Sequence, residues 1–386
     1  MTLYKKNICI ISSSRAEFGI IRNLAKSLIK LKSINTEVVL IGSHNIHTRN
    51  KSVNEINDLN IKKFHQINLP NKNDLPNDIL NRSSLLLKKI AKLFKKKKYN
   101  LLLVLGDRYE ILITSYAAVL HKIPIAHLSG GDETLGSYDN QFRNAITKFS
   151  NFHFATNELS KKRILKMGEN KKKVYNFGSL SIQNIKETPK ISKILLEEEY
   201  KIKFKKKIFI VTYHPETLST DSDKKISLIL ESINYFKDYF FIFTSPNNDE
   251  GANKIKKIIL KYARTRKNFK YIKSLGQKNY FKFLMHVDGV IGNSSSGVHE
   301  VPSFKIGTVN IGNRQLGRQK INSVINVNYT KKDIIRAIKK ISSTKFKNKL
   351  KQTINPYERK NTKQNIIKKL ISFLKKDIST VKKFYE

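Results

Sequence analysis

The chain is poor in cysteine and acidic side chains, and it lacks long apolar runs. Its one cysteine, Cys9, excludes a disulfide framework and a metal site built from several thiolates. The longest apolar stretches have only the length of a strand, so we predict no membrane-spanning helix. The first apolar run ends in a polar loop without a small-residue cleavage site, which favours a cytoplasmic protein over an exported one.

Acidic residues are scarce relative to basic ones: 30 Asp plus Glu stand against 75 Lys plus Arg, a formal net charge of +45. Such a charge raises the hypothesis of a nucleic-acid partner. The basic residues are spread along the whole chain in short runs, as at 95–98 and 171–173, which is typical of solvated surfaces. We therefore predict no nucleic-acid partner and expect the positive field to attract a phosphorylated small molecule.

The length of 386 residues, 39% of them hydrophobic, suits two packed domains of ordinary size. Apolar strands alternate with helix-spaced apolar positions, which indicates an α/β fold of two Rossmann-like, doubly wound domains facing across a cleft. We place the domains at residues 1–187 and 188–360. After a break at 355–358, the pattern predicts a basic amphipathic helix over 364–384.

The stretch 99–150 carries the densest group of candidate site residues. They follow two predicted strands, 101–105 and 123–128, and begin the next helix: Asp107, His127, Asp132, Glu133, Asp139 and Arg143. Any one acid alone could be only a helix cap or part of a turn. Because ligands bind at the carboxyl ends of strands in an open parallel sheet, we expect the group to form a site. Several carboxylates and a histidine in one crevice suit general acid/base catalysis.

Two further strand ends are followed by small polar residues. A strand at 7–11 leads into three serines and Arg15, and a strand at 289–291 leads into Ser294, Ser295 and a helix carrying Glu300. A strand, a small-residue loop and a helix start form the layout of a phosphate site, although Arg15 could equally be a surface residue. The chain has no G-x-G-x-x-G dinucleotide fingerprint. The residues alone therefore predict an enzyme acting on a nucleotide-activated small molecule.

Seven motifs extend this prediction. In chain order they are SSRAEFGI (13–20), GDRYE (106–110), HLSGGD (127–132), DNQFRNAITK (139–148), YHPET (213–217), GNSSSGVHEV (292–301) and GNRQLGR (312–318). Each is weak alone, but the ordered set is specific and spans most of the chain. As a set it resembles the hydrolysing UDP-N-acetylglucosamine 2-epimerases of sialic-acid and related nonulosonic-acid synthesis.

This resemblance implies the architecture of B-type glycosyltransferases, with a C-terminal helix at 361–386 that packs back on the first domain. It implies chemistry without a metal or a nicotinamide cofactor. A base removes the C2 proton of the sugar while UDP leaves C1, and water then adds to the glycal intermediate to release the free 2-epimer. It also implies a homodimer or homotetramer.

The resemblance also implies roles for individual residues. The residues that match UDP-binding or substrate-binding positions are Arg15, Arg143, Ser294, Ser295, Glu300 and Arg314. Those that match positions of proton transfer, or lie beside them, are Asp107, Asp132, Asp139 and His127, and His214 is a catalytic candidate that also matches a position of the UDP grip. Which acid takes the C2 proton stays open. So does the choice between Asp132 and Glu133, because many family members carry glutamate after the paired glycines. Gln183 stands where relatives often have an aspartate.

Several functions remain as alternatives to release of N-acetylmannosamine and UDP from UDP-N-acetylglucosamine. The same chemistry could act on UDP-N,N'-diacetylbacillosamine, on the legionaminic-acid route. A non-hydrolysing epimerase is disfavoured, because SRAEFG and YHPET resemble the hydrolysing branch more closely. A glycosyltransferase of the same architecture would not need three acids and a histidine, and a non-catalytic nucleotide-sugar binder would need none.

Overall fold

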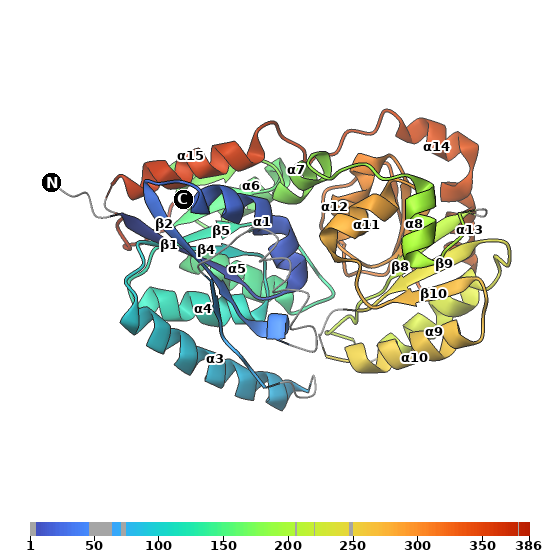
Figure 1. The fold of residues 1–386 in the computed structure, drawn as a ribbon, viewed down its shortest axis with the longest axis horizontal. Coiled ribbons are helices and arrows are strands. Elements are labelled where there is room, and N and C mark those ends of the chain that lie inside the picture. Colours follow the sequence, from blue (N-terminus) through green and yellow to red (C-terminus); the bar gives the residue numbers. More distant parts are fainter. Residues whose placement is uncertain are drawn as a thin grey trace. The chain divides into compact units, whose positions relative to one another are not determined.

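The computed structural model describes residues 5–45, 64–70, 75–204, 207–219, 221–246, 250–376 and 378–386. The chain forms two compact units, each around its own parallel sheet (Figure 1). The first unit comprises residues 1–132, 139–184 and 357–386, and the second comprises 133–138 and 185–356. The predicted α/β class with two parallel sheets is confirmed.

The sheet of the first unit has seven parallel strands in the order β3-β2-β1-β4-β5-β6-β7. Its strands are β1 (Lys6–Ser12), β2 (Ile34–Leu40), β3 (Phe64–Gln66), β4 (Leu101–Leu105), β5 (Ile125–Leu128), β6 (Phe152–Ala155) and β7 (Val174–Asn176). The apolar run of β4 is buried on both faces. Leu101, Leu103 and Leu105 belong to one hydrophobic core, while Leu102 and Val104 belong to the core on the other face.

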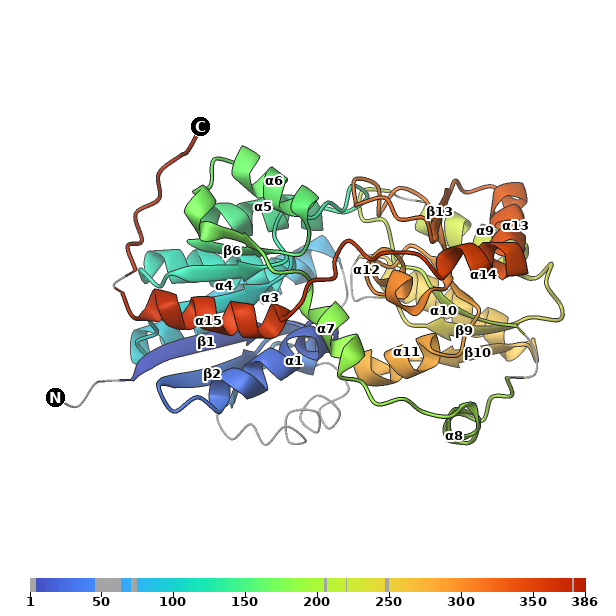
Figure 2. The same ribbon diagram turned by 90° about the horizontal axis from the view of Figure 1, so that it is seen from above.

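Helices cover both faces of this sheet, as Figures 1 and 2 show. The first unit contains α1 (Arg15–Ile29), α3 (Pro76–Lys96), α4 (Tyr109–Leu120), α5 (Asp139–Phe149), α6 (Glu158–Lys166), α7 (Leu180–Lys186) and α15 (Thr362–Leu374). α1 and α15 pack in one core, and α3 and α4 pack in the other. Residues of α1 one turn apart, from Phe18 to Leu28, are buried because their spacing places them on one helix face.

The C-terminal helix is shorter than the sequence pattern predicted. α15 ends at Leu374, where its apolar stripe ends, and residues 378–386 are not helical. The Lys382 ammonium instead donates to the Glu169 carboxylate at 2.9 Å. The main-chain N–H of Tyr385 donates to the carbonyl of Gly168 at 3.1 Å. These contacts fix the chain end against the turn that follows α6, and they favour an extended tail over further helix.

The second sheet has six parallel strands in the order β10-β9-β8-β11-β12-β13. Its strands are β8 (Ile208–Thr212), β9 (Phe240–Thr244), β10 (Phe269–Ile272), β11 (Gly289–Gly292), β12 (Gly307–Ile311) and β13 (Val324–Val327). The helices of this unit are α8 (Lys193–Tyr200), α9 (Ser222–Ile233), α10 (Ala252–Arg264), α11 (Gly276–Leu284), α12 (Ser296–His299), α13 (Lys331–Ser342) and α14 (Thr344–Leu350). α9, α10 and α13 pack in one core, and α8 and α11 pack in the other.

Each sheet has one point where the strand order reverses, which is where doubly wound folds bind ligands. In the first sheet it lies between β1 and β4, and in the second between β8 and β11. The loops after these four strands carry Asp107, His214, Ser294 and Ser295, and Arg15 begins the helix after β1. The fold therefore supports their grouping by sequence.

One short segment departs from the expected division at residues 187 and 360. Residues 133–138 follow β5 of the first unit in sequence but cluster with the second unit. There the Tyr138 N–H donates to the Thr217 hydroxyl at 3.3 Å, and Thr217 in turn lies 3.2 Å from the Ser137 hydroxyl.

Of the described helices, none combines the length and apolar character needed to cross a bilayer.

Candidate active site

The candidate site of the first unit begins where β4 ends. Gly106 has φ +81°, a conformation that favours glycine, and it is followed by Asp107. The Asp107 carboxylate forms an ion pair with the Arg143 guanidinium of α5. The side chain of Arg143 is only 3% exposed, and that of Asp107 is 24% exposed. A buried guanidinium thus holds a carboxylate that still reaches solvent.

Arg143 also fixes the loop after β5. Its Nη1 donates to the main-chain oxygen of Asp132 at 2.8 Å and to the Asn140 side chain at 3.3 Å. Because one guanidinium bonds both strand ends, the structure brings together Asp107, Asp132 and Arg143, as the sequence predicted. Asp139 begins α5, one turn before Arg143, and is half-buried.

The Asp132 carboxylate turns toward the start of α6. Its Oδ1 accepts from the Ser160 hydroxyl at 2.5 Å and from the Asn157 amide at 3.4 Å. Gly131, at φ +76°, lies so close to α6 that a Cβ there would be 2.2 Å from the Ser160 carbonyl oxygen. Glu133 lies elsewhere: within the second unit its carboxylate sits against Gly317. Of the two acids after the paired glycines, Asp132 is thus the one beside Asp107 and Arg143.

His127 is fully buried beneath these loops. Its Nε2 lies 2.8 Å from the Gly106 carbonyl and its Nδ1 lies 3.3 Å from the Thr147 hydroxyl. Since a carbonyl only accepts, Nε2 carries the proton. Burial lowers the pKa of His127 to about 3, so the ring is neutral at neutral pH. Through its hydrogen bond to the Gly106 carbonyl, the imidazole therefore holds the turn next to Asp107.

A buried polar cluster that the sequence prediction missed lies at the end of β1. The Glu17 carboxylate accepts from the Ser13 N–H at 2.8 Å and from the Ser13 hydroxyl at 2.7 Å. Burial raises the pKa of Glu17 to about 7. The spacing of Ser14 and Glu17 matches a capping box, and Ser14 does accept from the Glu17 N–H at 3.2 Å. That spacing is the signal that could have identified this carboxylate.

The cluster changes the expected phosphate loop at residues 12–14. Both donors of Ser13 are occupied by a carboxylate of the same chain. The Ser12 hydroxyl is likewise bonded, to His44 Nε2 at 2.9 Å. Arg15 begins α1. Burial, and then the positive charges of Arg108 and Arg15, lower the pKa of His44 to about 3. Ser12 and Ser13 therefore both bond groups of the same chain, and phosphate binding by Arg15 stays a prediction.

In the second unit the structure brings together His214 and Arg314. Both are buried, and both lie next to Asn293. The His214 N–H donates to the Asn293 side-chain oxygen at 2.7 Å, and Arg314 Nη1 is 3.5 Å from the Asn293 carbonyl. Burial, and then the positive charge of Arg314, holds the pKa of His214 well below its usual range. The imidazole is therefore neutral next to a cation.

Ser294 and Ser295 follow β11 and are half-buried. The helix that the sequence predicts after them stops before Glu300. α12 has only four residues, and a 3-10 turn (Val301–Phe304) follows it. The Gly-rich run and Pro302 explain the short helix, because both disfavour a continuous one. Glu300, between the two turns, is 8% exposed.

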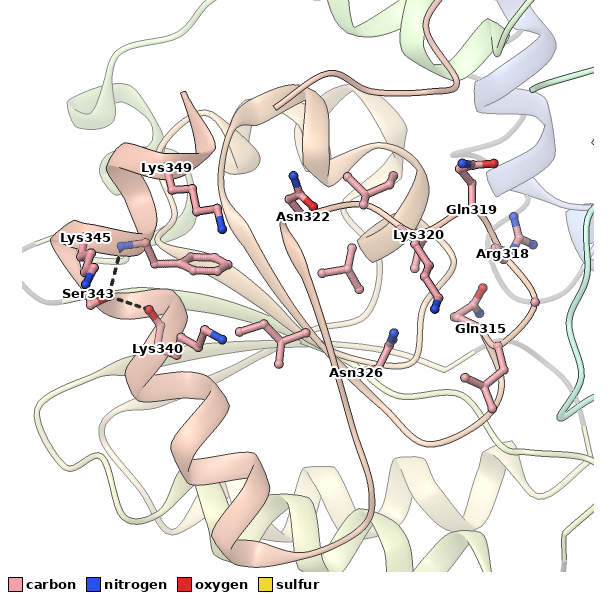
Figure 3. Close-up of a pocket in the computed structure, with 17 residues that line it drawn as sticks. Gln315, Arg318, Gln319, Lys320, Asn322, Asn326, Lys340, Ser343, Lys345 and Lys349 are labelled. Atoms are coloured by element: carbon pink, nitrogen blue, oxygen red, sulfur yellow. Dashed lines mark hydrogen bonds between the residues drawn. The ribbon is translucent and has the colours of Figure 1, made fainter. Parts of the chain in front are cut away.

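A cavity of about 750 Å³ lies in the second unit beside the loop after β12 (Figure 3). It runs beside β13, with Gln315 and Arg318 at one end and Lys345 and Lys349 at the other. None of its lining residues is a predicted site residue. Its cations are mostly exposed lysines, as expected for a surface of this charge. The cavity shares part of the loop after β12 with the candidate site, but the predicted residues His214, Ser294 and Arg314 are not among its lining residues.

Comparisons with known proteins identify the family of this chain. The family described as UDP-N-acetylglucosamine 2-epimerase matches residues 26–371. The chain belongs to this family. Polysialic acid biosynthesis protein P7 of Escherichia coli is 36% identical, over 99% of this chain and 97% of that protein. The hydrolysing GDP/UDP-N,N'-diacetylbacillosamine 2-epimerase of Campylobacter jejuni is 34% identical, over 89% of each chain.

Solved epimerases share the fold. The UDP-GlcNAc 2-epimerase of Neisseria meningitidis, bound to UDP-GlcNAc, superposes with a TM-score of 0.80 at 19% identity, over 95% of this chain and all of that chain. The Staphylococcus aureus MnaA–UDP structure gives 0.79 at 18% identity, over 99% and 100%. The resemblance predicted from the seven motifs is thus confirmed. The chain is a hydrolysing UDP-sugar 2-epimerase.

Proposed function

We propose that this epimerase converts UDP-N-acetylglucosamine and water to N-acetylmannosamine and UDP. The observation that carries the proposal is the Asp107–Arg143 pair at the reversal point of the first sheet. A carboxylate that is fixed by a buried guanidinium and still reaches solvent can meet a sugar and accept its C2 proton. The family indicates the reaction, and the geometry of the Asp107–Arg143 pair makes Asp107 the candidate base.

The other residues of the first unit divide into two roles. Asp139 is half-buried at the start of α5 and is the second candidate for proton transfer. Asp132 and His127 are buried, and their polar atoms bond other protein groups. We therefore assign them to holding the loops that carry Asp107, in place of direct proton transfer. Arg143 then acts through Asp107 rather than on the sugar.

We assign UDP to the loops of the second unit that follow β8, β11 and β12, and Arg15 of the first unit stays a predicted anion ligand. Departure of UDP develops negative charge, which fixed donors stabilise best. Arg314 supplies a guanidinium, the neutral His214 ring supplies one N–H, and Ser294 and Ser295 supply hydroxyl and main-chain donors. Glu300 is assigned to the ribose hydroxyls, since a carboxylate accepts from both. The proposed mechanism uses no metal and no nicotinamide.

UDP-N,N'-diacetylbacillosamine is the second candidate substrate. Two relatives are named for this nucleotide sugar, one from Campylobacter jejuni and one from Legionella pneumophila at 29% identity. The experiment offers each UDP-sugar separately and identifies the free sugar and UDP by chromatography. Release of N-acetylmannosamine from the first supports the proposal. Turnover of only the diacetylbacillosamine nucleotide assigns the second substrate, and turnover of neither contradicts both.

We further propose a homodimer or homotetramer. Tyr116, Val119 and Leu120 expose large apolar side chains on α4, which supports a protein-covered surface there. Light scattering of the purified protein tests the state, and a monomer would contradict this proposal.

A further inference from the structure

One buried amide connects the three loops of the second unit that carry the proposed UDP ligands. Asn293 follows β11 directly and has no exposed surface. Its Oδ1 accepts from the His214 N–H at 2.7 Å, and its Nδ2 donates to the His214 carbonyl at 2.9 Å. The Asn293 carboxamide thus bonds both the main-chain N–H and the main-chain carbonyl of His214, in the loop after β8.

The Asn293 carboxamide acts here as a main-chain peptide group would, because it accepts one hydrogen bond and donates another. β8 and β11 pair in parallel as far as Thr212 and Gly292, and the ladder ends there. Gly292 lies so close to β8 that a Cβ would be 1.9 Å from the Thr212 carbonyl oxygen. Two residues beyond Thr212, the Asn293 side chain bonds the main chain of His214. The pairing of the two chains therefore continues past the strands.

The main chain of Asn293 holds the third loop. Its carbonyl accepts from Gln315 Nε2 at 2.9 Å and lies 3.5 Å from Arg314 Nη1. Gln315 and Arg314 both belong to the loop after β12 and are buried. Glu216 makes a second connection between the loops after β8 and β12, because its Oε1 accepts from the Asn313 N–H at 3.3 Å. The loops after β8, β11 and β12 therefore share hydrogen bonds at Asn293.

We infer that Asn293 is a positioning residue that sets the geometry of the UDP site without contacting UDP. The inference rests on the function proposed above, in which these loops bind UDP. Removing the carboxamide removes both of its hydrogen bonds to the His214 main chain, which is costly enough for the loop to rearrange. His214 and Arg314 would then lose their fixed relation, and the preorganised grip on the diphosphate would weaken.

The test compares Asn293→Ala with Asn310→Ala. Asn310 is an equally buried asparagine of β12 whose amide donates to the Asn326 side chain at 2.8 Å. Both variants should lose similar thermal stability, because each loses a buried amide. UDP affinity, measured by titration calorimetry, should fall at least about tenfold in Asn293→Ala and stay within about twofold in Asn310→Ala.

Equal UDP affinity in the two variants would overturn the inference. If Asn293→Ala does not fold, Gln315→Ala carries the test, since it removes the amide that ties the third loop to Asn293. It should weaken UDP binding severalfold, and unchanged binding would overturn the inference. A wild-type protein that binds no UDP would instead contradict the proposed function. The two failures are therefore distinguishable.

Discussion

Glu17 should make the stability of this epimerase depend on pH in a direction opposite to that of most carboxylates. Burial raises its pKa from 4.5 to about 7, so the folded protein favours the protonated form. The corresponding stability is fully present below pH 4.5 and is lost as the pH rises to 7. At 1.36 kcal/mol for each pH unit between these two pKa values, the effect amounts to about 3 kcal/mol of unfolding free energy.

The perturbation that isolates this effect is Glu17→Gln. Glutamine keeps an oxygen that can accept from the Ser13 N–H and hydroxyl, but it cannot ionise. Between about pH 5 and about pH 8, the unfolding free energy of the wild type should fall by roughly 2 to 3 kcal/mol more than that of the variant.

Urea unfolding followed by circular dichroism measures both proteins at both pH values. All other titrating groups are shared, so their contributions cancel in the difference between the two proteins. Parallel pH profiles of the wild type and Glu17→Gln would refute the reasoning. A wild type that gains stability relative to the variant as pH rises would reverse its sign.

Three further predictions follow from single contacts. Asp107→Asn should lower kcat by about 10²-fold or more while UDP affinity, measured by calorimetry, stays near that of the wild type; full activity would exclude Asp107 as the base. Gly131→Ala should destabilise the protein by about 2 to 4 kcal/mol, because the Cβ meets a carbonyl at 2.2 Å and φ is +76°; an unchanged Tm would contradict this. Lys382→Met should free the tail from Glu169, so a protease that does not cut at lysine should cleave the tail faster than in the exposed control Lys383→Met. Equal cleavage of the two variants would contradict the assigned contact.

Most strands could be predicted because they contain short, mainly apolar runs. β4, β5 and β8 are buried on both faces, and such runs are visible in a sequence without any knowledge of the fold. β13 was not predicted. It is an edge strand of four residues, VINV, that is only partly buried and includes an exposed asparagine. An edge strand has little apolar pattern to find.

The grouping of Asp107, Asp132 and Arg143 could be predicted from topology, since all three follow neighbouring strands. The direction of each side chain could not. The Asp132 carboxylate is oriented by Ser160, 28 residues away, and Glu133 lies in the other unit. Whether a serine loop is open to phosphate likewise depended on Glu17, which occupies Ser13. Such choices are made by tertiary contacts that spacing along the chain does not show.

The central claim is that the chain eliminates UDP and rebuilds the sugar at C2 with a proton from solvent. Proton NMR of the reaction with UDP-N-acetylglucosamine in deuterated water tests it directly. We predict free UDP together with free N-acetylmannosamine that carries deuterium at C2. A product that keeps its C2 proton, or that remains attached to UDP, would contradict the hydrolysing mechanism.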